Sequence, residues 1–515
     1  MTNRRELLCN GAFLSAIAAL GIKPAQVLAA DGGLLKVRME ADIQVLDPGY
    51  MIGGAETSLL YACTPRLAQP KKEADGTWGW APSDYVEKIT QDDPTHISFT
   101  LKPGFMWNGD LGEVTTDDVK YSFERMLKSD WAARWPTLDH VEAKDKYNGV
   151  IVLKAPFAAT FLMGIASESG SILPKAAVEK LKDQKFTTEL PGQCGPYTLV
   201  EWTPKQKVVI KANPDWKGTK PTFSEVRFIN VEDTSAAELA FEAGEVAITN
   251  VLPATAARYL KELPKNAKLN SIAGPYYTWI GMNTQHERLK DIRVRKAIQY
   301  AIDTKSILEA AYGGTAPQAH GVVPIGVVGC RKETKYSYNP DEARKLLAEA
   351  GVTDLTVEFK TLNEAYRVTA AQIVQANLGD VGIKCDIIPL DSGPFWNLGL
   401  ESKGEDWKNL QLWWMRFRCS PDPSDAIQWF IKSQVGVWNW ERWSDQEYED
   451  LWTKALSEPD NAKREVMYQR MQEIMEDTGA YVWITHDPLN YVHSDKIVPD
   501  FDTGGEILVE RFTGV

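Results

Sequence analysis

The chain has 515 residues, of which 44% are apolar and 25% are charged, and its formal net charge is −13. A chain of this length is too long for one hydrophobic core, so we expect two or three domains. The acidic balance argues against a nucleic acid or an anionic membrane surface as the main partner.

The first thirty residues are typical of an export signal and not of a folded domain. The positive pair at 4–5 precedes an apolar run at 12–22 that is too short to span a bilayer. Small residues at 27 and 29 predict cleavage after residue 29 or 30. The paired arginines followed by leucines also resemble a twin-arginine signal. We therefore expect a soluble, exported protein that resides in the periplasm.

Apolar periodicity and turn residues predict a mixture of strands and helices along the rest of the chain. The expected strands cover residues 34–41, 96–101, 150–154, 197–202, 206–211, 224–230, 276–282, 383–389, 412–418 and 481–486. The expected helices cover residues 56–62, 115–127, 235–243, 291–302, 342–350, 370–380, 444–456 and 461–477, with Ser444 capping the seventh. The mixture, with units typical of parallel sheets, places the fold in the α/β class.

The stretch 412–425, LWWMRFRCSPDPSD, combines adjacent tryptophans with two arginines at strand spacing. Side chains alternate along an extended chain, so Arg416 and Arg418 are expected on the same face. Pro421 and Pro423 then end regular pairing. Two guanidinium groups beside indoles suit an anionic ligand that has an apolar or sugar face. A surface strand with solvated arginines is the alternative interpretation.

Five cysteines remain after removal of the signal, which contains Cys9. An odd number excludes a fully paired framework and allows one or two disulfides in an oxidising compartment. No two of them have the CxxC spacing, which argues against a zinc or redox role. These cysteines are Cys63, Cys194, Cys330, Cys385 and Cys419.

The sequence lacks the motifs of the common catalytic sites. His286-Glu287 is not followed by a second histidine at HExxH spacing, and no GxSxG, GxxxxGK or GxGxxG occurs. The six histidines are scattered, which disfavours a metal cluster. We therefore predict no catalytic residue, no metal and no cofactor.

Five ordered blocks of the sequence are similar to the family 5 extracellular solute-binding proteins, the oligopeptide-, dipeptide- and nickel-binding partners of ABC transporters. The first contains FTLKPGFMWNGD and TTDDVKYSFERML, the second CGPYTLVEWTPKQKVVIKANPDW, and the third YYTWIGMNT and DIRVRKAIQYAID. The fourth is YNPDEARKLLAEAG and the fifth SDQEYEDLWTKAL. They lie at 99–127, 194–216, 276–303, 338–351 and 444–456.

The resemblance implies a two-lobed periplasmic-binding-protein clamshell of type II with an extra subdomain. Lobe I would combine residues 31–60, 185–275 and 486–515, the extra subdomain would be 61–184, and lobe II would be 276–485. The ligand would lie between the lobes. The implied partners are a small-molecule ligand and the transmembrane subunits of an ABC permease, with the binding protein itself a monomer.

The segment 414–418 departs from the family pattern. Peptide-binding members carry an aspartate there that pairs with the α-amino group of the peptide. Here that aspartate is absent and arginines flank its place, whereas the later Asp422-Pro423 is kept. Because an unpaired buried charge costs several kcal/mol, the change predicts a different ligand charge. We expect a small anionic or zwitterionic solute: an opine-like sugar–amino-acid conjugate, a sugar acid or an acidic peptide. A general di- or oligopeptide is the alternative, and an exported hydrolase is a third hypothesis.

The predicted ligand site also uses aromatic and small residues near these segments. Tyr277 and Trp279 share one face of their strand, and indoles provide flat surfaces for a sugar or an aliphatic chain. Packing within a core is the alternative for each tryptophan. The predicted ligand-binding residues are Arg416, Arg418, Trp413, Trp414, Trp279, Tyr277, Trp440, Asn439, Arg442, Trp443, Asp422, Tyr50, Gly53 and Gly54.

Overall fold

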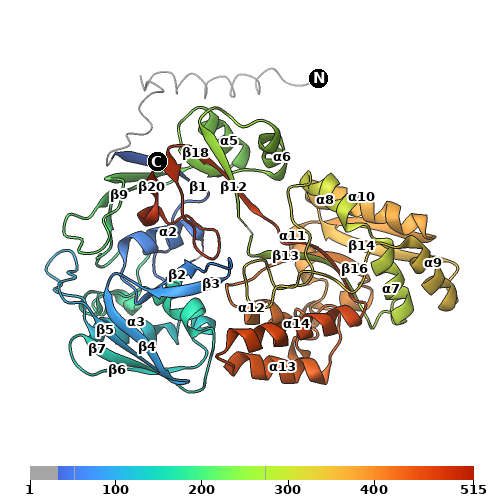
Figure 1. Ribbon diagram of the computed structural model, residues 1–515, viewed down its shortest axis with the longest axis horizontal. Coiled ribbons are helices and arrows are strands. Elements are labelled where there is room, and N and C mark those ends of the chain that lie inside the picture. Colours follow the sequence, from blue (N-terminus) through green and yellow to red (C-terminus); the bar gives the residue numbers. More distant parts are fainter. Residues whose placement is uncertain (1–32, 52, 273) are drawn as a thin grey trace.

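Two α/β lobes lie side by side in the computed structural model, which describes residues 33–51, 53–272 and 274–515 (Figure 1). One contains the segments coloured blue to green together with the red C-terminal segment, and the other contains those coloured yellow to orange-red. The predicted export signal lies outside the described residues. Among the described residues, no helix combines the length and the apolar character needed to cross a membrane.

Two sheets build lobe I, one of four strands in the order β1-β10-β9-β8 and one of three in the order β11-β18-β12. β1 runs parallel to β10, and β8 and β9 form an antiparallel hairpin. β18 is C-terminal yet pairs with both β11 and β12, so the end of the chain returns to this lobe. The strands are β1 (Leu34–Met39), β8 (Tyr197–Thr203), β9 (Lys207–Ala212), β10 (Glu225–Asn230), β11 (Ile248–Asn250), β12 (Ala267–Ile272) and β18 (Leu489–Ser494). The helices are α2 (Gly54–Cys63), α5 (Thr234–Glu242) and α6 (Pro253–Lys261), and the short strands β19 (Ile497–Val498) and β20 (Thr513–Gly514) pair nearby.

An extra subdomain is inserted after α2. It contains an antiparallel pair, β2 with β3, and a four-stranded antiparallel sheet in the order β4-β5-β7-β6. Thr115 and Asp118 form a reciprocal capping box that starts its main helix. Its elements are β2 (Ala68–Lys72), β3 (Trp78–Pro82), β4 (Val86–Asp93), β5 (His96–Leu101), α3 (Thr116–Met126), β6 (Leu138–Ala143), β7 (Asn148–Leu153) and α4 (Lys175–Val178).

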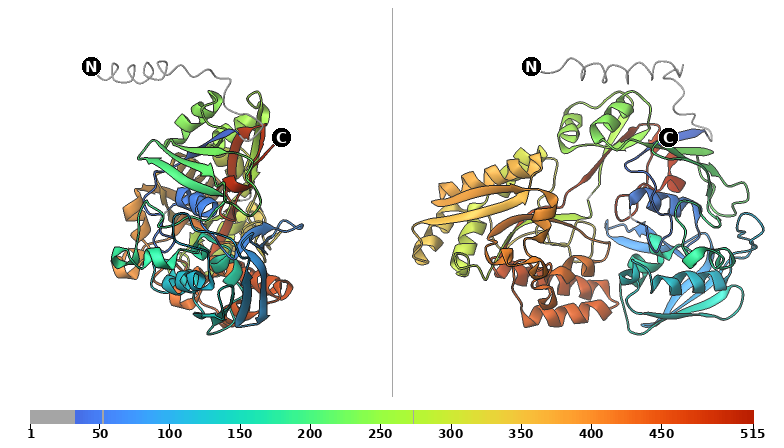
Figure 2. Two further views of the ribbon diagram at one scale, coloured as in Figure 1. Left: turned by 90° about the vertical axis from the view of Figure 1, so that its left-hand side faces the viewer. Right: turned by 180° about the vertical axis from the view of Figure 1, so that it is seen from behind.

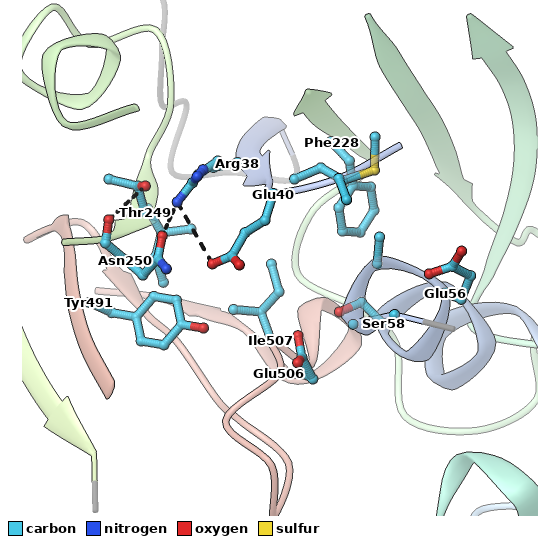
Figure 3. A pocket seen from close by; sticks show the side chains of 16 residues that line it. Arg38, Glu40, Glu56, Ser58, Phe228, Thr249, Asn250, Tyr491, Glu506 and Ile507 are labelled. Atoms are coloured by element: carbon cyan, nitrogen blue, oxygen red, sulfur yellow. Dashed lines mark hydrogen bonds and ion pairs between the residues drawn. The ribbon is translucent and has the colours of Figure 1, made fainter. Parts of the chain in front are cut away.

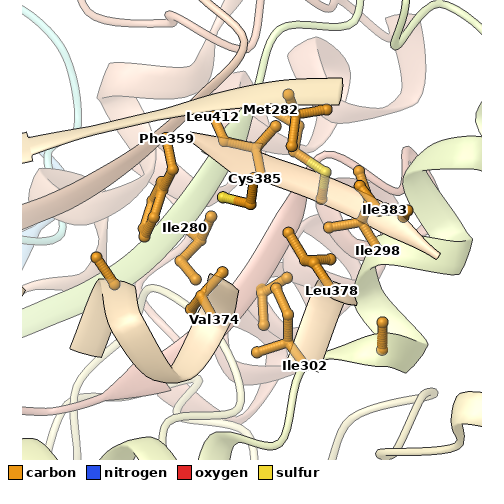
Figure 4. Packing of buried hydrophobic residues seen from close by; sticks show 14 of the residues in the cluster. Ile280, Met282, Ile298, Ile302, Phe359, Val374, Leu378, Ile383, Cys385 and Leu412 are labelled. Carbon is orange, nitrogen blue, oxygen red and sulfur yellow. The ribbon is translucent and has the colours of Figure 1, made fainter. Parts of the chain in front are cut away.

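Lobe II is built on one mixed sheet in the order β15-β14-β16-β13-β17, with helices on both faces (Figure 2). Alternation along β16 separates two cores: Leu412 and Trp414 face one side, and Trp413 and Met415 face the other. Figure 4 shows the first core, in which Leu412 packs with residues of α7 and α10. The strands are β13 (Tyr276–Met282), β14 (Leu355–Leu362), β15 (Ile383–Leu390), β16 (Leu412–Arg418) and β17 (Tyr481–Thr485). The helices are α7 (Ile292–Ala301), α8 (Thr304–Tyr312), α9 (Pro340–Glu349), α10 (Ala365–Asp380), α11 (Ser392–Asn397), α12 (Pro423–Ile427), α13 (Gln446–Ser457) and α14 (Asn461–Asp477).

Two chain connections join the lobes, one between β12 and β13 and the other between β17 and β18. They touch at Gly274, where an added methyl group would collide with the carbonyl oxygen of Asp487. The Asp487 carboxylate accepts hydrogen bonds from Arg416 Nε at 2.5 Å and from the Thr278 hydroxyl at 3.0 Å. This carboxylate therefore ties the second connection to β13 and β16.

The extra subdomain also contacts lobe II, away from the two connections. The Ala158 amide donates to the Leu456 carbonyl oxygen at 3.0 Å, and the Trp78 amide donates to the Gly326 carbonyl oxygen at 3.0 Å. Phe157 and Met163 pack against Leu456 in a small apolar cluster. The subdomain thus bridges the two lobes at a second place.

Most of the sequence-predicted elements are present, and four of them, at 96–101, 276–282, 412–418 and 461–477, have the predicted bounds. One capping prediction was wrong: Asp445, not Ser444, caps α13, because its carboxylate accepts the Tyr448 amide at 3.0 Å. The patterns missed several helices and the strands β2, β3, β4, β6, β11, β12, β14, β18, β19 and β20. The expected boundary at residue 60 falls inside α2, and the domain limits remain predictions.

All five cysteines of the described chain are free thiols. Cys63 packs in the lobe I core and Cys194 in the subdomain core, although the Cys194 amide donates to the Cys63 carbonyl oxygen at 3.1 Å. Burial raises the pKa of both thiols to about 12. The structure therefore contains neither of the disulfides that the sequence allowed.

A buried ion pair inside lobe II gives a first prediction. Nη2 of Arg464 on α14 lies 2.7 and 2.8 Å from the carboxylate oxygens of Asp422, and the two side chains are 4% and 1% exposed. Replacing Arg464 with Met leaves the buried Asp422 carboxylate without its ion-pair partner. We therefore expect a loss of about 3–5 kcal/mol of stability, seen as a lower Tm in calorimetry.

Arg470→Met is the matched control, because Arg470 lies on the same helix but is 40% exposed in its pair with Glu447. It should cost at most about 1 kcal/mol. Equal destabilisation by the two substitutions would contradict the assignment.

Candidate functional site

A cavity of about 420 Å³ lies between the two lobes and the extra subdomain. Lobe I contributes the start of α2 and the turn 502–506, and lobe II contributes the end of β16 and the start of α12. Its walls carry two guanidinium and four carboxyl groups, which are those of Arg134, Arg418, Glu168, Asp425, Asp502 and Glu506. We call it the interlobe cavity. Its volume lies within the range of small-molecule sites.

The lobe I wall is shaped by the tight turn 502–506. Asp502 is 5% exposed, and its Oδ1 accepts the amides of Gly504 at 2.7 Å and Glu506 at 2.8 Å. Burial, with repulsion from Glu168, raises the pKa of Asp502 to about 6. Burial and repulsion from Asp502 raise the pKa of Glu506 to about 8. At neutral pH the Glu506 carboxyl therefore holds its proton unless a cation approaches it.

Gly54 allows the Glu506 carboxyl to reach the first turn of α2. A methyl group at Gly54 would collide with the carboxyl group of Glu506. No side chain caps this helix, whose N-cap residue is Gly53. The amides of the first turn are therefore open to an acceptor, and a carboxylate placed there also complements the helix dipole.

Arg418 crosses from lobe II to the lobe I wall. It is the last residue of β16, and its guanidinium group lies against Gly504, where a methyl group would collide with Nη2. The Arg418 side chain makes no hydrogen bond or ion pair with the residues that the structure describes, although its backbone pairs with Tyr276 in the sheet. A solvent-accessible guanidinium at the edge of the cavity, beside two buried carboxyl groups, can bind a ligand carboxylate.

The extra subdomain closes the third side with an aromatic and charged cluster. The Trp131 indole donates to the Met51 carbonyl oxygen at 3.0 Å, which fixes the ring beside the cavity. Arg134 lies over the Trp131 ring at 5.1 Å and pairs with Glu168 at 3.3 Å. Because Arg134 is already paired, Arg418 is the guanidinium left for a ligand.

Three sequence-predicted residues line the interlobe cavity: Gly53, Gly54 and Arg418. Arg416 extends from the same face of β16, but its guanidinium pairs with Asp487 and stacks on Tyr276 at 3.5 Å. The two arginines therefore serve different purposes, one holding the lobe connection and the other facing the cavity.

The predicted aromatic residues of β13 and β16 pack in the interior of lobe II. Tyr277 and Trp279 do share one face, with ring centroids 5.4 Å apart, but each is 1% exposed. Trp413 and Trp414 are both 0% exposed, one in each core of the lobe. None of the four lines the cavity, because helices cover both faces of this sheet.

The predicted residues of the loop 439–443 form a buried network inside lobe II. Asn439 donates to the carbonyl oxygens of Phe430 and Trp443, both at 3.0 Å, and accepts the Arg442 amide at 2.9 Å. Arg442 has a positive φ of 61° and pairs with Glu401 at 2.5 Å. Trp440 and Trp443 are 1% and 7% exposed. This network shapes the loop and does not line the interlobe cavity.

Asp422 and Tyr50 also lie outside the cavity lining. Asp422 caps α12 and pairs with Arg464. The Tyr50 ring lies 3.7 Å from Lys185 Nζ, and its hydroxyl donates to the Lys128 carbonyl oxygen of the extra subdomain at 3.4 Å.

Most of the charged and aromatic residues that line the cavity were not among the predicted ligand-binding residues. These are Trp131, Glu168, Asp425, Trp429, Asp502 and Glu506. The Gly504-Gly505 pair was a usable turn signal near two of them. No cluster of three or more metal-ligating side chains occurs in the part of the chain that the structure covers.

Comparison with known proteins identifies relatives along most of the chain. Residues 81–439 match the family model described as bacterial extracellular solute-binding proteins, family 5 Middle. The chain is 27% identical over 467 residues to the probable D,D-dipeptide-binding periplasmic protein DdpA of Escherichia coli, covering 88% of each chain. It is 26% identical over 367 residues to the glutathione-binding protein GsiB of Escherichia coli, covering 69% of this chain and 70% of that protein.

The fold is shared with solved binding proteins. The periplasmic binding protein DppA from Helicobacter pylori, in complex with the peptide STSA, superposes with a TM-score of 0.72 at 22% identity and covers 94% of this chain and 98% of its own. This likeness confirms the predicted two-lobed binding-protein fold.

The buried Glu441 at the centre of the 439–443 loop gives a second prediction. It is 0% exposed, and its Oε1 accepts the Trp279 indole N–H at 2.8 Å. Burial raises the pKa of Glu441 to about 8 from 4.5. The folded state thus keeps a proton that the unfolded state releases above pH 4.5, so stability is lost as the pH rises towards 8.

Glu441→Gln removes this ionisation. We expect the variant to be more stable than the unmodified protein at pH 9, by up to roughly 4 kcal/mol, with the gap closing towards pH 4.5. Thermal unfolding of both proteins from pH 4.5 to pH 9 measures the gap. A gap that does not change with pH would show that Glu441 is ionised in the folded state.

Proposed function

Because the chain belongs to the family 5 bacterial extracellular solute-binding proteins, we propose that it is the periplasmic binding component of an ABC importer and that its ligand is a short peptide. The charge pattern of the interlobe cavity is the observation that supports a short peptide as the ligand. Arg418 of lobe II and the carboxyl groups of Asp502 and Glu506 of lobe I line the same cavity. A short peptide carries a carboxylate and an ammonium group at its two ends, and therefore matches both sides.

The excess of carboxyl over guanidinium groups argues against a purely anionic ligand. Of the two arginines, Arg134 is paired within its own wall. A sugar acid or an opine would bring a further negative charge next to the Asp502 carboxylate, and like charges at close range are unfavourable. The relatives named for dipeptides and glutathione also support the peptide, which was the alternative in the sequence analysis.

Ligand binding would hold the two lobes together. A molecule whose carboxylate contacts Arg418 and whose ammonium contacts the 502–506 turn touches both lobes at once. It therefore stabilises the closed arrangement relative to an open one by its contacts to the second lobe. This role requires the protein to bind and release its ligand, and it requires no bond-breaking step. The hydrolase hypothesis is therefore not needed to explain the site. The closed monomer would then be presented to the transmembrane subunits of the permease.

The carboxylate contact of Arg418 gives a third prediction. Arg418→Met should weaken binding of trialanine at least tenfold in calorimetry, because a charge-assisted hydrogen bond contributes about 1.5–3 kcal/mol. Trialanine amide, which lacks the carboxylate, should bind both proteins equally.

Arg344→Met is the matched control: Arg344 lies on α9, pairs with Asp341 and is 50% exposed. It should leave the affinity for trialanine unchanged. If Arg418→Met binds trialanine as tightly as the unmodified protein, Arg418 is not the carboxylate partner.

The raised pKa of Glu506 gives a fourth prediction. A ligand ammonium placed beside Glu506 stabilises its ionised form and lowers its pKa, so peptide binding at pH 7 should release up to one proton. Affinity for trialanine should therefore rise between pH 6 and pH 8. Calorimetry at pH 7 in phosphate and in Tris, which differ in ionisation enthalpy, counts the protons. N-acetyl-trialanine is the control, and equal proton release by both peptides would rule out the ammonium contact.

A further inference from the structure

A smaller cavity inside lobe I adjoins the interlobe cavity (Figure 3). Its volume is about 150 Å³, enough for on the order of five water molecules. Gly53, Gly54 and Glu506 line both cavities, so the two spaces meet at the Glu506 carboxyl group. We call the smaller space the lobe I pocket. Its lining includes Arg38, Glu40, Glu56, Phe228, Tyr491, Glu506 and Ile507.

The polar groups of the lobe I pocket are mainly oxygen acceptors. Figure 3 shows the carboxyl groups of Glu40 and Glu506 and the hydroxyl group of Tyr491 around the same space. The Tyr491 hydroxyl donates to the Gly505 carbonyl oxygen at 3.0 Å, which leaves its oxygen free to accept. The Glu506 carboxyl accepts no hydrogen bond from the described residues. These groups call for a donor with several N–H groups.

The cation that lines this pocket, Arg38, is already engaged. Its Nε donates to the Val231 carbonyl oxygen at 2.8 Å and its Nη2 to the Glu232 carbonyl oxygen at 2.9 Å. Nη1 contacts the Asn250 amide oxygen and lies 3.7 Å from Glu40.

One engaged guanidinium faces the carboxyl groups of Glu40, Glu56 and Glu506. Glu56 already accepts the amides of Gln44 at 2.8 Å and Val45 at 3.4 Å, which leaves Glu40 and Glu506 for a ligand. A cation placed beside Glu506 would also favour its ionised form, so the pocket favours a further positive charge.

The remaining walls suit a hydrocarbon chain. Phe228 and Ile507 line the pocket, and their side chains are 1% and 9% exposed. Glu40 is at the outer end with 61% of its side chain exposed, whereas Glu506 is at the inner end beside the interlobe cavity. A flexible chain that enters from the interlobe cavity would thus pass apolar walls and end among carboxyl groups.

We propose that the lobe I pocket binds the basic side chain of a lysine- or arginine-containing peptide, with its charged end between Glu506 and Glu40 and its aliphatic stem along Phe228 and Ile507. The inference rests on the proposed peptide-binding function and adds a specificity to it. Lysine and arginine both combine a hydrocarbon stem with a multiple N–H donor.

The test compares matched tripeptides by calorimetry at low ionic strength. Lysine is placed at the first, second or third position of trialanine, and each peptide has a partner with norleucine, which keeps the stem and lacks the charge. At one position we expect lysine to bind at least tenfold more tightly than norleucine. The same preference at that position should hold for arginine.

Glu40→Gln removes one of the two carboxyl groups assigned to the basic end of the side chain and leaves the lining of the interlobe cavity unchanged. It should reduce the lysine preference at least threefold and leave the affinity for the norleucine peptide unchanged. Glu262→Gln, an exposed position just after α6 in the same lobe, is the control and should change neither.

The outcomes separate this inference from the proposed function. If every norleucine peptide binds as tightly as its lysine partner, the basic-side-chain pocket is overturned while peptide binding stands. A lysine preference that Glu40→Gln leaves unchanged would overturn the assignment to this pocket. Failure of all the tripeptides and of trialanine to bind would overturn the proposed function itself.

Discussion

The ion pair between Arg416 and Asp487 ties one of the two lobe connections to lobe II, and the charge available to a ligand depends on it. Asp487 lies in the second of the two connections, and its carboxylate also accepts the hydroxyls of Thr278 at 3.0 Å and Tyr312 at 3.3 Å. β13, β16 and α8 therefore meet the connection at a single carboxylate, which is only 10% exposed. A charge buried to this extent is tolerated because each of its oxygen atoms has a partner.

The Arg416–Asp487 pair also determines which of the two arginines is available to a ligand. Arg416 and Arg418 leave β16 on the same side, yet Asp487 occupies the first, so only Arg418 is free for a ligand. Two arginines that looked like an anion clamp thus supply one positive charge. That charge faces a turn with two buried carboxyl groups, Asp502 and Glu506. The ligand charge follows from this balance across the cavity and not from the sequence of one strand.

Local patterns predicted the elements well, and the site only in part. Alternation gave β5 and β13 their bounds, and it placed Arg416 and Arg418 on one face. The adjacent tryptophans Trp413 and Trp414 gave no such guidance, because a strand covered on both faces buries both. Asp502, Glu506 and Glu168 come from distant segments, and only the tertiary fold brings them together with Arg418. Ser444 and Asp445 are both suitable N-cap residues, and the backbone conformation at the start of α13 decides which of them caps the helix. The sequence pattern does not contain that conformation.

The two chain connections between the lobes can act as a hinge. A rigid rotation of one lobe about this hinge moves each atom in proportion to its distance from the rotation axis. Arg418 precedes Cys419, whose amide donates to the Pro275 carbonyl oxygen in the first connection at 2.7 Å, so Arg418 has a short lever arm. The contact of Ala158 with Leu456 is formed far from the two connections, at the lower edge where α13 meets the extra subdomain (Figure 1). A small rotation near the cavity therefore produces a larger displacement at that edge.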